Sequence, residues 1–206
     1  MRYQDLKNQL KDFPVFSLAD IRKIEAPFHR RQLSTWVEKK YIKKIRRGHY
    51  MFSDTVLNEE VLFLIANRIY TPSYVSFESA LSYYGLIPEG VYSITSACGR
   101  KTARFRTPIA EFTYRKIRPE LLFGYNLQQI GNQRCKIAEI EKAVLDYLYL
   151  NPAIARDADF YEWRFNSADF LDRADIGKLR RYAEAFQSKA LLARLEQLIR
   201  LIQNSK

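Results

Sequence analysis

The sequence predicts an α+β protein with a small helical unit and a hairpin at its N-terminus, a mixed α/β unit after it, and a helical tail. Residues 1–52 hold three short amphipathic patterns followed by a hairpin pattern. Strand-like segments separated by Gly and Pro turns come next, and the residues after Pro152 return to helical spacing. We therefore expect two domains, at residues 1–55 and 56–206, with the tail starting near residue 153.

Three helices are predicted in the first domain. The first pattern covers residues 3–13 and ends at Pro14, and the third covers residues 28–41. Ser17 followed by Asp20 is typical of an N-cap and its capping partner, which starts the second helix. The apolar residues that these helices are expected to bury are Tyr3, Leu6, Leu10, Phe13, Leu18, Ile21, Ile24, Leu33, Trp36, Val37 and Tyr41.

A hairpin pattern follows directly in YIKKIRRGHYMF, residues 41–52. Its turn is expected at residues 46–49, where Gly48 can adopt the positive φ that a tight turn needs. Three short helices followed by a hairpin is the order of a winged helix-turn-helix. Such a module places its last helix in the major groove of DNA, and its hairpin can lie along the neighbouring backbone or minor groove.

Positive charge is concentrated in this first domain. The chain has 34 Lys and Arg against 23 Asp and Glu, a net charge of +11. Residues 1–50 alone hold 13 Lys and Arg against 5 Asp and Glu. This asymmetry indicates a polyanionic partner, either nucleic acid or an anionic membrane surface, and the order of helices and hairpin favours double-stranded DNA over a membrane.

The candidate DNA-binding residues lie on the third helix and the hairpin. Arg30 and Arg31 stand at the start of the helix, where Arg can bind guanine bidentately. Gln32, Ser34 and Thr35 follow them as residues that can read bases or hold phosphates. The residues expected to position phosphates are Lys39, Lys43, Lys44, Arg46 and Arg47, with His49 and Tyr50 as neutral hydrogen-bonding partners.

The second domain is predicted to mix helices and strands. Asn58 caps a helix that runs to Tyr70, and Gly85 closes a second helix that starts at Ser76. The remaining expected elements are strands at residues 91–97, 103–105, 109–117 and 127–130, a helix at residues 137–150, and further helices in the tail.

A second basic run gives a possible second positive patch. Its residues are Arg100, Lys101, Arg104, Arg106 and Arg115. Arg104 and Arg106 share one face of an extended strand because side chains alternate along it. Nucleic acid, an acidic protein and an ordinary solvated strand surface all remain open as explanations of this run.

The sequence does not indicate catalysis, a cofactor or a metal site. It has no phosphate-binding glycine motif, and neither His29 nor His49 has the spacing of a metal ligand. Glu139, Glu141 and Asp146 are the acids that a metal-dependent nuclease would use. We interpret them as two carboxylates at a helix N-terminus and one exposed acid.

The cysteines and the first residues favour an intracellular protein. Cys98 and Cys135 form no CxxC pair, which argues against a disulfide framework or a zinc site. The start, MRYQDLKNQL, is charged and lacks the apolar core of a signal peptide, and no apolar run is long enough to span a membrane. We expect a cytoplasmic protein without a membrane partner.

Four segments carry a resemblance to a known family. The order RRGHYMF, PSYVSFESALSYYGLIPEGVYSITSA, AEFTYRKI and IAEIEKAVLDYLYLNP resembles the AbiEi antitoxins of bacterial type IV toxin-antitoxin and abortive-infection systems, over residues 15–152. The resemblance implies a winged helix that represses its own operon at promoter repeats. It also implies a second domain that counters a nucleotidyltransferase-like toxin, without a stable complex being required. It maps the DNA-contacting helix to residues 29–39 and the wing to residues 43–50, and it supplies no catalytic residue.

We therefore expect an antitoxin that is also a DNA-binding autorepressor. Inverted promoter repeats would be bound by a dimer or by two monomers, and the sequence does not choose between them. Two alternatives from other classes remain. One is a winged-helix protein-interaction module or a stand-alone transcriptional regulator without a toxin partner, and the other is a DNA-cleaving enzyme. The tail after Pro152 lies outside the resemblance, so its role stays open.

Overall fold

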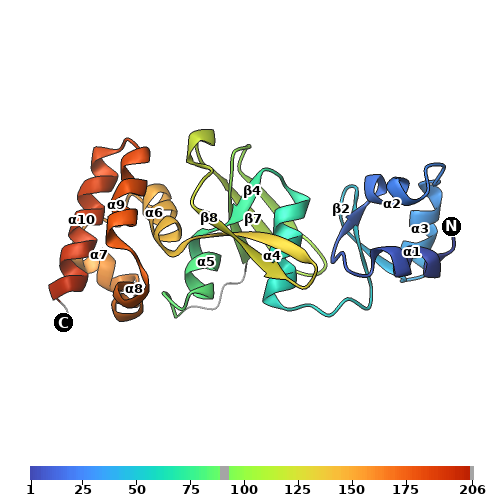
Figure 1. The fold of residues 1–206 in the computed structure, drawn as a ribbon, viewed down its shortest axis with the longest axis horizontal. Helices are drawn as coiled ribbons and strands as arrows, with labels where there is room; N and C mark the ends of the chain where they lie inside the picture. Colours follow the sequence, from blue (N-terminus) through green and yellow to red (C-terminus); the bar gives the residue numbers. More distant parts are fainter. Residues whose placement is uncertain (89–92, 205–206) are drawn as a thin grey trace.

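The structure is a computed structural model, and it describes residues 1–88 and 93–204. It is α+β: N-terminal helices with a small antiparallel sheet, then a mixed sheet, then C-terminal helices. Figure 1 shows these parts side by side along the long axis, with the two termini at opposite ends. In the described ranges, no helix is both long and apolar enough to cross a membrane.

The N-terminal unit, residues 1–55, combines three helices with three strands. They are α1 (Tyr3–Leu10), β1 (Phe16–Ser17), α2 (Leu18–Ile24), α3 (Arg31–Glu38), β2 (Ile42–Arg46) and β3 (His49–Phe52). The sheet order is β1-β3-β2, and all pairs are antiparallel. The predicted cap of α2 is confirmed, because the backbone N–H of Asp20 donates to the Ser17 hydroxyl while the Asp20 carboxylate accepts from the Ser17 N–H.

Two helices of this unit are shorter than predicted. α1 ends at Leu10, and α3 excludes Phe28 and Tyr41 from the predicted range. Lys40 has a φ of +57°, a left-handed conformation that cannot continue a right-handed helix. Phe28 is nevertheless buried from the preceding loop, whereas Tyr41 is 43% exposed. Strand β1 was not predicted, since two residues are too few to show alternation.

The N-terminal unit has its own apolar core. Ring contacts join Phe16 to Phe52 at 4.8 Å and Phe28 to Trp36 at 5.6 Å between centroids. The buried residues of this core are Leu6, Leu10, Phe16, Ile21, Phe28, Leu33, Trp36, Ile42, Tyr50 and Phe52. The helices and the hairpin are therefore held together by one cluster, which fixes α3 against β2.

The second unit, residues 56–204, is built on a six-stranded mixed sheet. Its strand order is β6-β7-β5-β4-β9-β8. The strands are β4 (Ser73–Val75), β5 (Ser93–Cys98), β6 (Ala103–Arg106), β7 (Glu111–Lys116), β8 (Tyr125–Ile130) and β9 (Gln133–Ala138), with a short 3-10 helix at Pro119–Leu121. The hairpin β8–β9 and the pair β6–β7 are antiparallel, whereas β5 pairs β7 in parallel.

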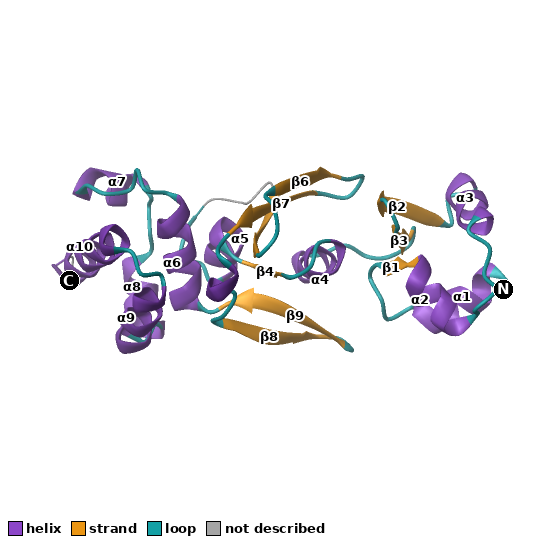
Figure 2. Cartoon of the chain, turned by 90° about the horizontal axis from the view of Figure 1, so that it is seen from above, coloured by secondary structure: helices purple, strands orange, loops and turns teal. Residues whose placement is uncertain are grey.

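Helices cover both faces of this sheet (Figure 2). On β7, the hydroxyl of Tyr114 donates to Ala66 in α4 (Glu59–Ile69), and the neighbouring Arg115 pairs with Glu78 in α5 (Phe77–Tyr83). Adjacent strand residues point to opposite faces, so α4 and α5 lie on opposite sides of the sheet. The predicted caps of both helices are confirmed: Asn58 accepts from the N–H of Val61, and Gly85 follows α5 with a φ of +70°.

Two parts of this region differ from the prediction made from the sequence. The predicted helix at residues 137–150 begins only at Ile140, because Ile137 still belongs to β9, where it pairs with Val75 of β4 in parallel. Both β4 and β9 were missed as strands. β5 begins at Ser93, and the first two residues of the strand predicted at residues 91–97 lie outside the described residues.

The predicted helical tail is confirmed. After α6 (Ile140–Leu150) come α7 (Asp157–Glu162), α8 (Ser167–Arg173), α9 (Ile176–Ala185) and α10 (Lys189–Asn204). The ring of Trp163 stacks on Tyr147 of α6 at 4.8 Å. Because α6 contacts both α5 and α9, it joins the tail to the sheet.

The two units are joined by apolar and polar contacts. Val15, Ile45 and Met51, on the outer face of the small sheet, belong to the same buried cluster as the core of the second unit. At the edge, Arg68 of α4 pairs with Asp20 at 2.8 Å. One side of the β2–β3 hairpin is therefore covered by the second unit.

Candidate nucleic-acid interface

Helix α3 presents a polar, basic face to solvent. Leu33 and Trp36 are buried on the core side, and this anchors the helix. Arg31, Ser34 and Thr35 are exposed on the other side, and Arg30 is exposed at the N-cap. The side chains of Arg30 and Arg31 have no ion-pair or hydrogen-bond partner in the described part of the chain. This face can therefore offer two guanidinium groups and two hydroxyls to a ligand.

Gln32 does not share that face. It is half-buried, and its Nε2 donates to the carbonyl of Met1 at 3.4 Å. At 100° per residue, position 32 lies well round the helix from positions 31 and 34. The predicted base-reading role of Gln32 therefore needs correction, since its amide faces another part of the N-terminal unit.

The β2–β3 hairpin has the predicted turn and a basic outer surface. Gly48 adopts a φ of +84°, which leaves Arg47 and Gly48 as the turn. Lys43 and Lys44 pair in regular register with Met51 and Tyr50, and both are exposed on β2, which is an edge strand of the small sheet. The register shifts only after them, between Lys44 and Arg46. Lys39 at the end of α3 is exposed as well. None of the side chains of Lys39, Lys43, Lys44 or Arg47 meets an acidic partner among the residues described.

Arg46 is not available to a phosphate. Its Nη1 donates to the carbonyl of Ile69, and its guanidinium lies 4.1 Å from the centroid of the Phe105 ring. Both partners belong to the second unit. Arg46 therefore holds the hairpin against the large sheet, and the prediction that it positions a phosphate finds no free guanidinium in this geometry.

The structure also places Tyr50 differently from the prediction. It is only 7% exposed and packs against Phe16 in the core of the N-terminal unit. The alternation along β3 explains this, since Tyr50 and Phe52 face the three helices while Met51 faces the second unit. The ring of Tyr50 therefore supports the hairpin from inside the N-terminal unit.

His49 is half-buried at the start of β3. Burial lowers the pKa of its imidazole, and the cations Arg46 and Arg68 act in the same direction, while the Arg47 backbone and Asp20 oppose them. The neutral ring is therefore favoured in the folded state. The predicted hydrogen bond from His49 to DNA has no direct support in this geometry.

This shift predicts a pH-dependent loss of stability that His49→Gln removes. The unfolded chain takes up the imidazole proton at a higher pH than the folded protein, so acidification favours unfolding below about pH 6.5. We expect the urea midpoint of the native protein to fall more than that of His49→Gln between about pH 7.5 and about pH 5.5. If the urea midpoints of the two proteins fall equally over this pH range, the assignment of the lowered pKa to His49 is contradicted.

Three of the five cations of the second basic patch have carboxylate partners. Arg104 and Arg106 share one face as predicted, but both pair with Glu111, at 2.6 and 3.1 Å. Arg115 pairs with Glu78 at 2.7 Å, and Arg100 lies over the ring of Tyr70. Lys101 is exposed without a side-chain partner among the described residues. The sequence suggested a positive patch because the acids that pair with these arginines lie in other segments.

The three acids considered for a nuclease do not form a metal site. Glu139 accepts from the Tyr182 hydroxyl, and Glu141 pairs with Lys178 at 3.0 Å. Asp146 is fully buried and bonded to Lys142, so its interpretation as an exposed acid was wrong. Across residues 1–88 and 93–204, no group of three or more His, Cys, Asp or Glu side chains is placed to hold a metal ion.

Comparison with known proteins adds no relative. No model of a protein family matches the chain, and a search of curated proteins finds no match. The class of protein must therefore be argued from the fold and from the basic surface of α3 and the hairpin.

Proposed function

We propose that the N-terminal unit is a winged helix-turn-helix that binds double-stranded DNA, with α3 as its recognition helix and the β2–β3 hairpin as its wing. The observation that carries this proposal is a set of six exposed cations on α3 and the hairpin whose side chains meet no acidic partner in the described residues. They are Arg30, Arg31, Lys39, Lys43, Lys44 and Arg47. Unpaired cations clustered on one helix and a hairpin are the electrostatic footprint of a nucleic-acid site.

The contrast with the second unit supports this. There, Arg104, Arg115 and Arg180 each pair with a carboxylate. Unpaired cations that lie close together repel one another, and a bound phosphate backbone would relieve this repulsion. The free basic surface of α3 and the hairpin is therefore favourable for binding a polyanion.

For the whole chain we propose an antitoxin that also represses its own operon. This part rests on the family resemblance of residues 15–152. The N-terminal unit would bind inverted promoter repeats as a dimer or as two monomers. The second unit would oppose a nucleotidyltransferase-like toxin in the cytoplasm, with or without a stable complex, and no enzymatic activity of its own is proposed.

The salt dependence of DNA binding tests the charge assignment. If the six exposed cations meet phosphates, the binding constant should fall with about the fifth power of salt concentration. Lys44→Ala should reduce that slope by about one, because one phosphate contact is lost. Fluorescence anisotropy with a duplex from upstream of the gene, titrated at several salt concentrations, measures both.

Arg46→Met is the matched control, because it removes a cation from the same strand whose guanidinium is already held by the second unit. We expect its slope to equal that of the native protein. An equal loss of slope in Arg46→Met and Lys44→Ala would show that Arg46 leaves Ile69 and Phe105 to bind DNA, contrary to the geometry.

Growth rescue tests the antitoxin part separately. Where the neighbouring gene encodes a nucleotidyltransferase-like protein that arrests growth, co-expression of the native chain should restore growth. A variant deficient in DNA binding should restore it equally, because the second unit is intact. No rescue by the native chain would leave a DNA-binding regulator without antitoxin activity.

A further inference from the structure

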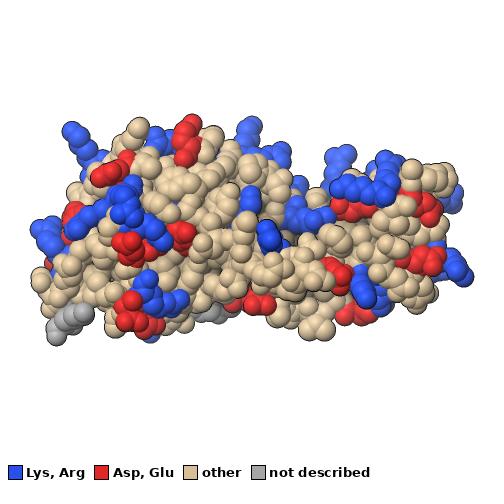
Figure 3. Space-filling view, viewed as in Figure 1, with Lys and Arg blue, Asp and Glu red and all other residues tan. Residues whose placement is uncertain are grey.

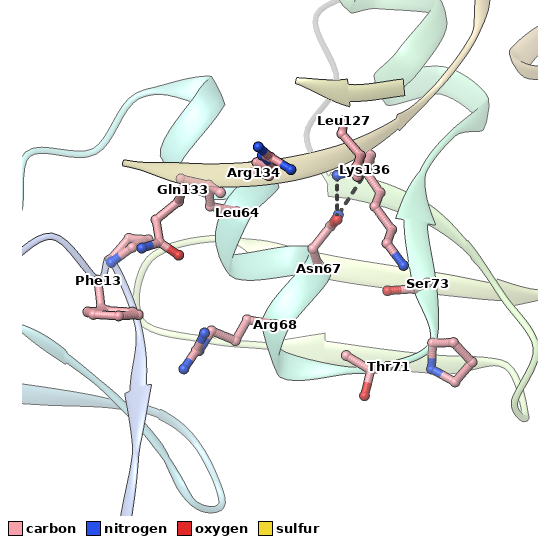
Figure 4. A pocket seen from close by; sticks show the side chains of 12 residues that line it. Phe13, Leu64, Asn67, Arg68, Thr71, Ser73, Leu127, Gln133, Arg134 and Lys136 are labelled. Carbon is pink, nitrogen blue, oxygen red and sulfur yellow. Dashed lines mark hydrogen bonds between the residues drawn. The ribbon is translucent and has the colours of Figure 1, made fainter. Parts of the chain in front are cut away.

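A groove of about 460 Å³ lies where the N-terminal unit meets the second unit (Figure 4). One wall comes from Phe13 and Pro14, in the segment between α1 and β1. The others come from α4, from the residues leading into β4, and from the β8–β9 hairpin. This volume is in the range of sites for small molecules, which often lie between domains.

The lining of the groove is cationic and contains no acidic residue among those described. Arg68, Arg134 and Lys136 all line it. Arg68 is compensated by Asp20 at 2.8 Å, but the side chains of Arg134 and Lys136 have no carboxylate partner in the described residues. On the face shown in Figure 3, Lys and Arg side chains gather near the junction of the two units.

The two uncompensated cations are held in place by the strand. Positions 134 and 136 alternate along β9 and so share one face. The Asn67 side chain bonds both backbone groups of Lys136, accepting from its N–H at 2.7 Å and donating to its carbonyl at 3.3 Å. In Figure 4 the Lys136 side chain extends across the groove toward Ser73. The site is therefore positioned before any ligand arrives.

We infer that this groove binds a small phosphorylated molecule of nucleotide size. Guanidinium and ammonium groups without carboxylate partners bind phosphate oxygens by charge-assisted hydrogen bonds. The ammonium of Lys136 lies 5.0 Å from the centroid of the Tyr125 ring, a contact that leaves its charge uncompensated. Phe13, Leu64 and Leu127 give the groove apolar surface for a planar or hydrocarbon portion. In Figure 2 the β8–β9 hairpin and α3 lie on opposite sides of the molecule, so a duplex bound along α3 does not account for these cations.

A ligand there would contact both units at once. Asp12 and Asp20 of the N-terminal unit are bonded to Asn132 and Arg68 next to the groove. A bound anion near Arg68 competes with Asp20 for the guanidinium. Because this ion pair joins the two units, weakening it changes their arrangement. We propose that the ligand alters operator affinity, and this regulatory part rests on the proposed DNA binding. Linkage then requires operator DNA to alter ligand affinity by the same factor.

Isothermal titration calorimetry of the full chain with ATP, GTP, AMP, inorganic phosphate and unphosphorylated adenosine tests the site. At least one nucleotide should bind, and adenosine should bind at least about tenfold more weakly. Arg134→Ala with Lys136→Ala should weaken the nucleotide by about tenfold or more, because two charged contacts are lost. The matched control, Lys101→Ala with Lys116→Ala, removes the same charge elsewhere in the second unit and should bind as the native chain does.

The outcomes separate this inference from the proposed DNA binding. No binding by any nucleotide, equal binding of adenosine, or native affinity in Arg134→Ala with Lys136→Ala overturns the site. Phosphate binding as tightly as the nucleotides would overturn the nucleotide-sized ligand.

Fluorescence anisotropy with operator DNA tests the regulatory part. The nucleotide should change the operator affinity of the native chain but not that of Arg134→Ala with Lys136→Ala. Without nucleotide, this double variant should bind the operator as tightly as the native chain does. An unchanged native affinity overturns the regulatory part, while a chain that binds nucleotide but no operator refutes the DNA-binding function alone.

Discussion

Replacing Arg30 and Arg31 together by alanine is expected to abolish specific binding to the operator. Both side chains are exposed at the start of α3 and have no partner among the described residues, so the fold does not depend on them. A bidentate contact of Arg with guanine contributes about 1–3 kcal/mol of discrimination, and two such contacts correspond to a loss of about a hundredfold or more. Non-specific binding through the hairpin should persist, because Lys43, Lys44 and Arg47 remain.

Anisotropy with operator and scrambled duplexes measures both effects, and circular dichroism checks the fold. Lys189→Ala with Arg200→Ala is the control, since it removes the same charge from exposed positions of α10 at the other end of the molecule. Operator affinity within about threefold of native in Arg30→Ala with Arg31→Ala would remove α3 from the interface. A comparable loss in the control variant would show that net charge, and not position, determines binding.

Asp146→Ala is expected to be the most destabilising single substitution, at about 3–5 kcal/mol. Asp146 and Lys142 lie one helical turn apart in α6, and both side chains are fully buried. The carboxylate also accepts hydrogen bonds from the hydroxyls of Tyr74 at 2.7 Å and Ser76 at 2.8 Å. Burial lowers the pKa of Lys142 and Asp146 counteracts this, so removing the carboxylate leaves an ammonium buried without its counter-ion.

Urea unfolding followed by circular dichroism measures this loss. Lys142→Met with Asp146→Leu is the informative control, because replacing a buried ion pair by apolar side chains is often close to neutral. We expect the double variant to be clearly more stable than Asp146→Ala. If the single variant loses less than about 1 kcal/mol, the ion pair is not the anchor of α6 that its burial indicates.

The local elements were largely predictable. Apolar spacing located the three N-terminal helices, Ser17 with Asp20 marked a cap, Gly48 marked the hairpin turn, and Asn58 and Gly85 bounded two helices. These features depend on interactions within a few residues, which a sequence displays directly. The missed strand β4 has three residues and is defined by β5 and β9, which are far away in the chain. The missed strand β9 forms a hairpin with β8, and its last residues are predicted to belong to the following helix because their apolar spacing also fits a helix.

The candidate site was only partly predictable for the same reason. Exposure of Arg30 and Arg31 followed from helical periodicity, whereas the joint exposure of the adjacent Lys43 and Lys44 does not follow from strand alternation. Arg46, only two positions from Lys44, is held by Ile69 and Phe105 of the second unit. The interpretation of Asp146 as an exposed acid was wrong because its burial depends on segments that pack against α6 from elsewhere in the chain.

The sequence by itself determined that the positive charge of this protein is concentrated on a small helical unit with a hairpin. That followed from composition and periodicity, which need no partner segment. The tertiary structure alone decided which charges are free: Glu111 and Glu78 pair with three arginines of the second basic run, Arg46 joins the two units, and Arg134 with Lys136 face an open groove. Coulomb energy depends on distances in space, and folding brings together charges that the sequence holds far apart.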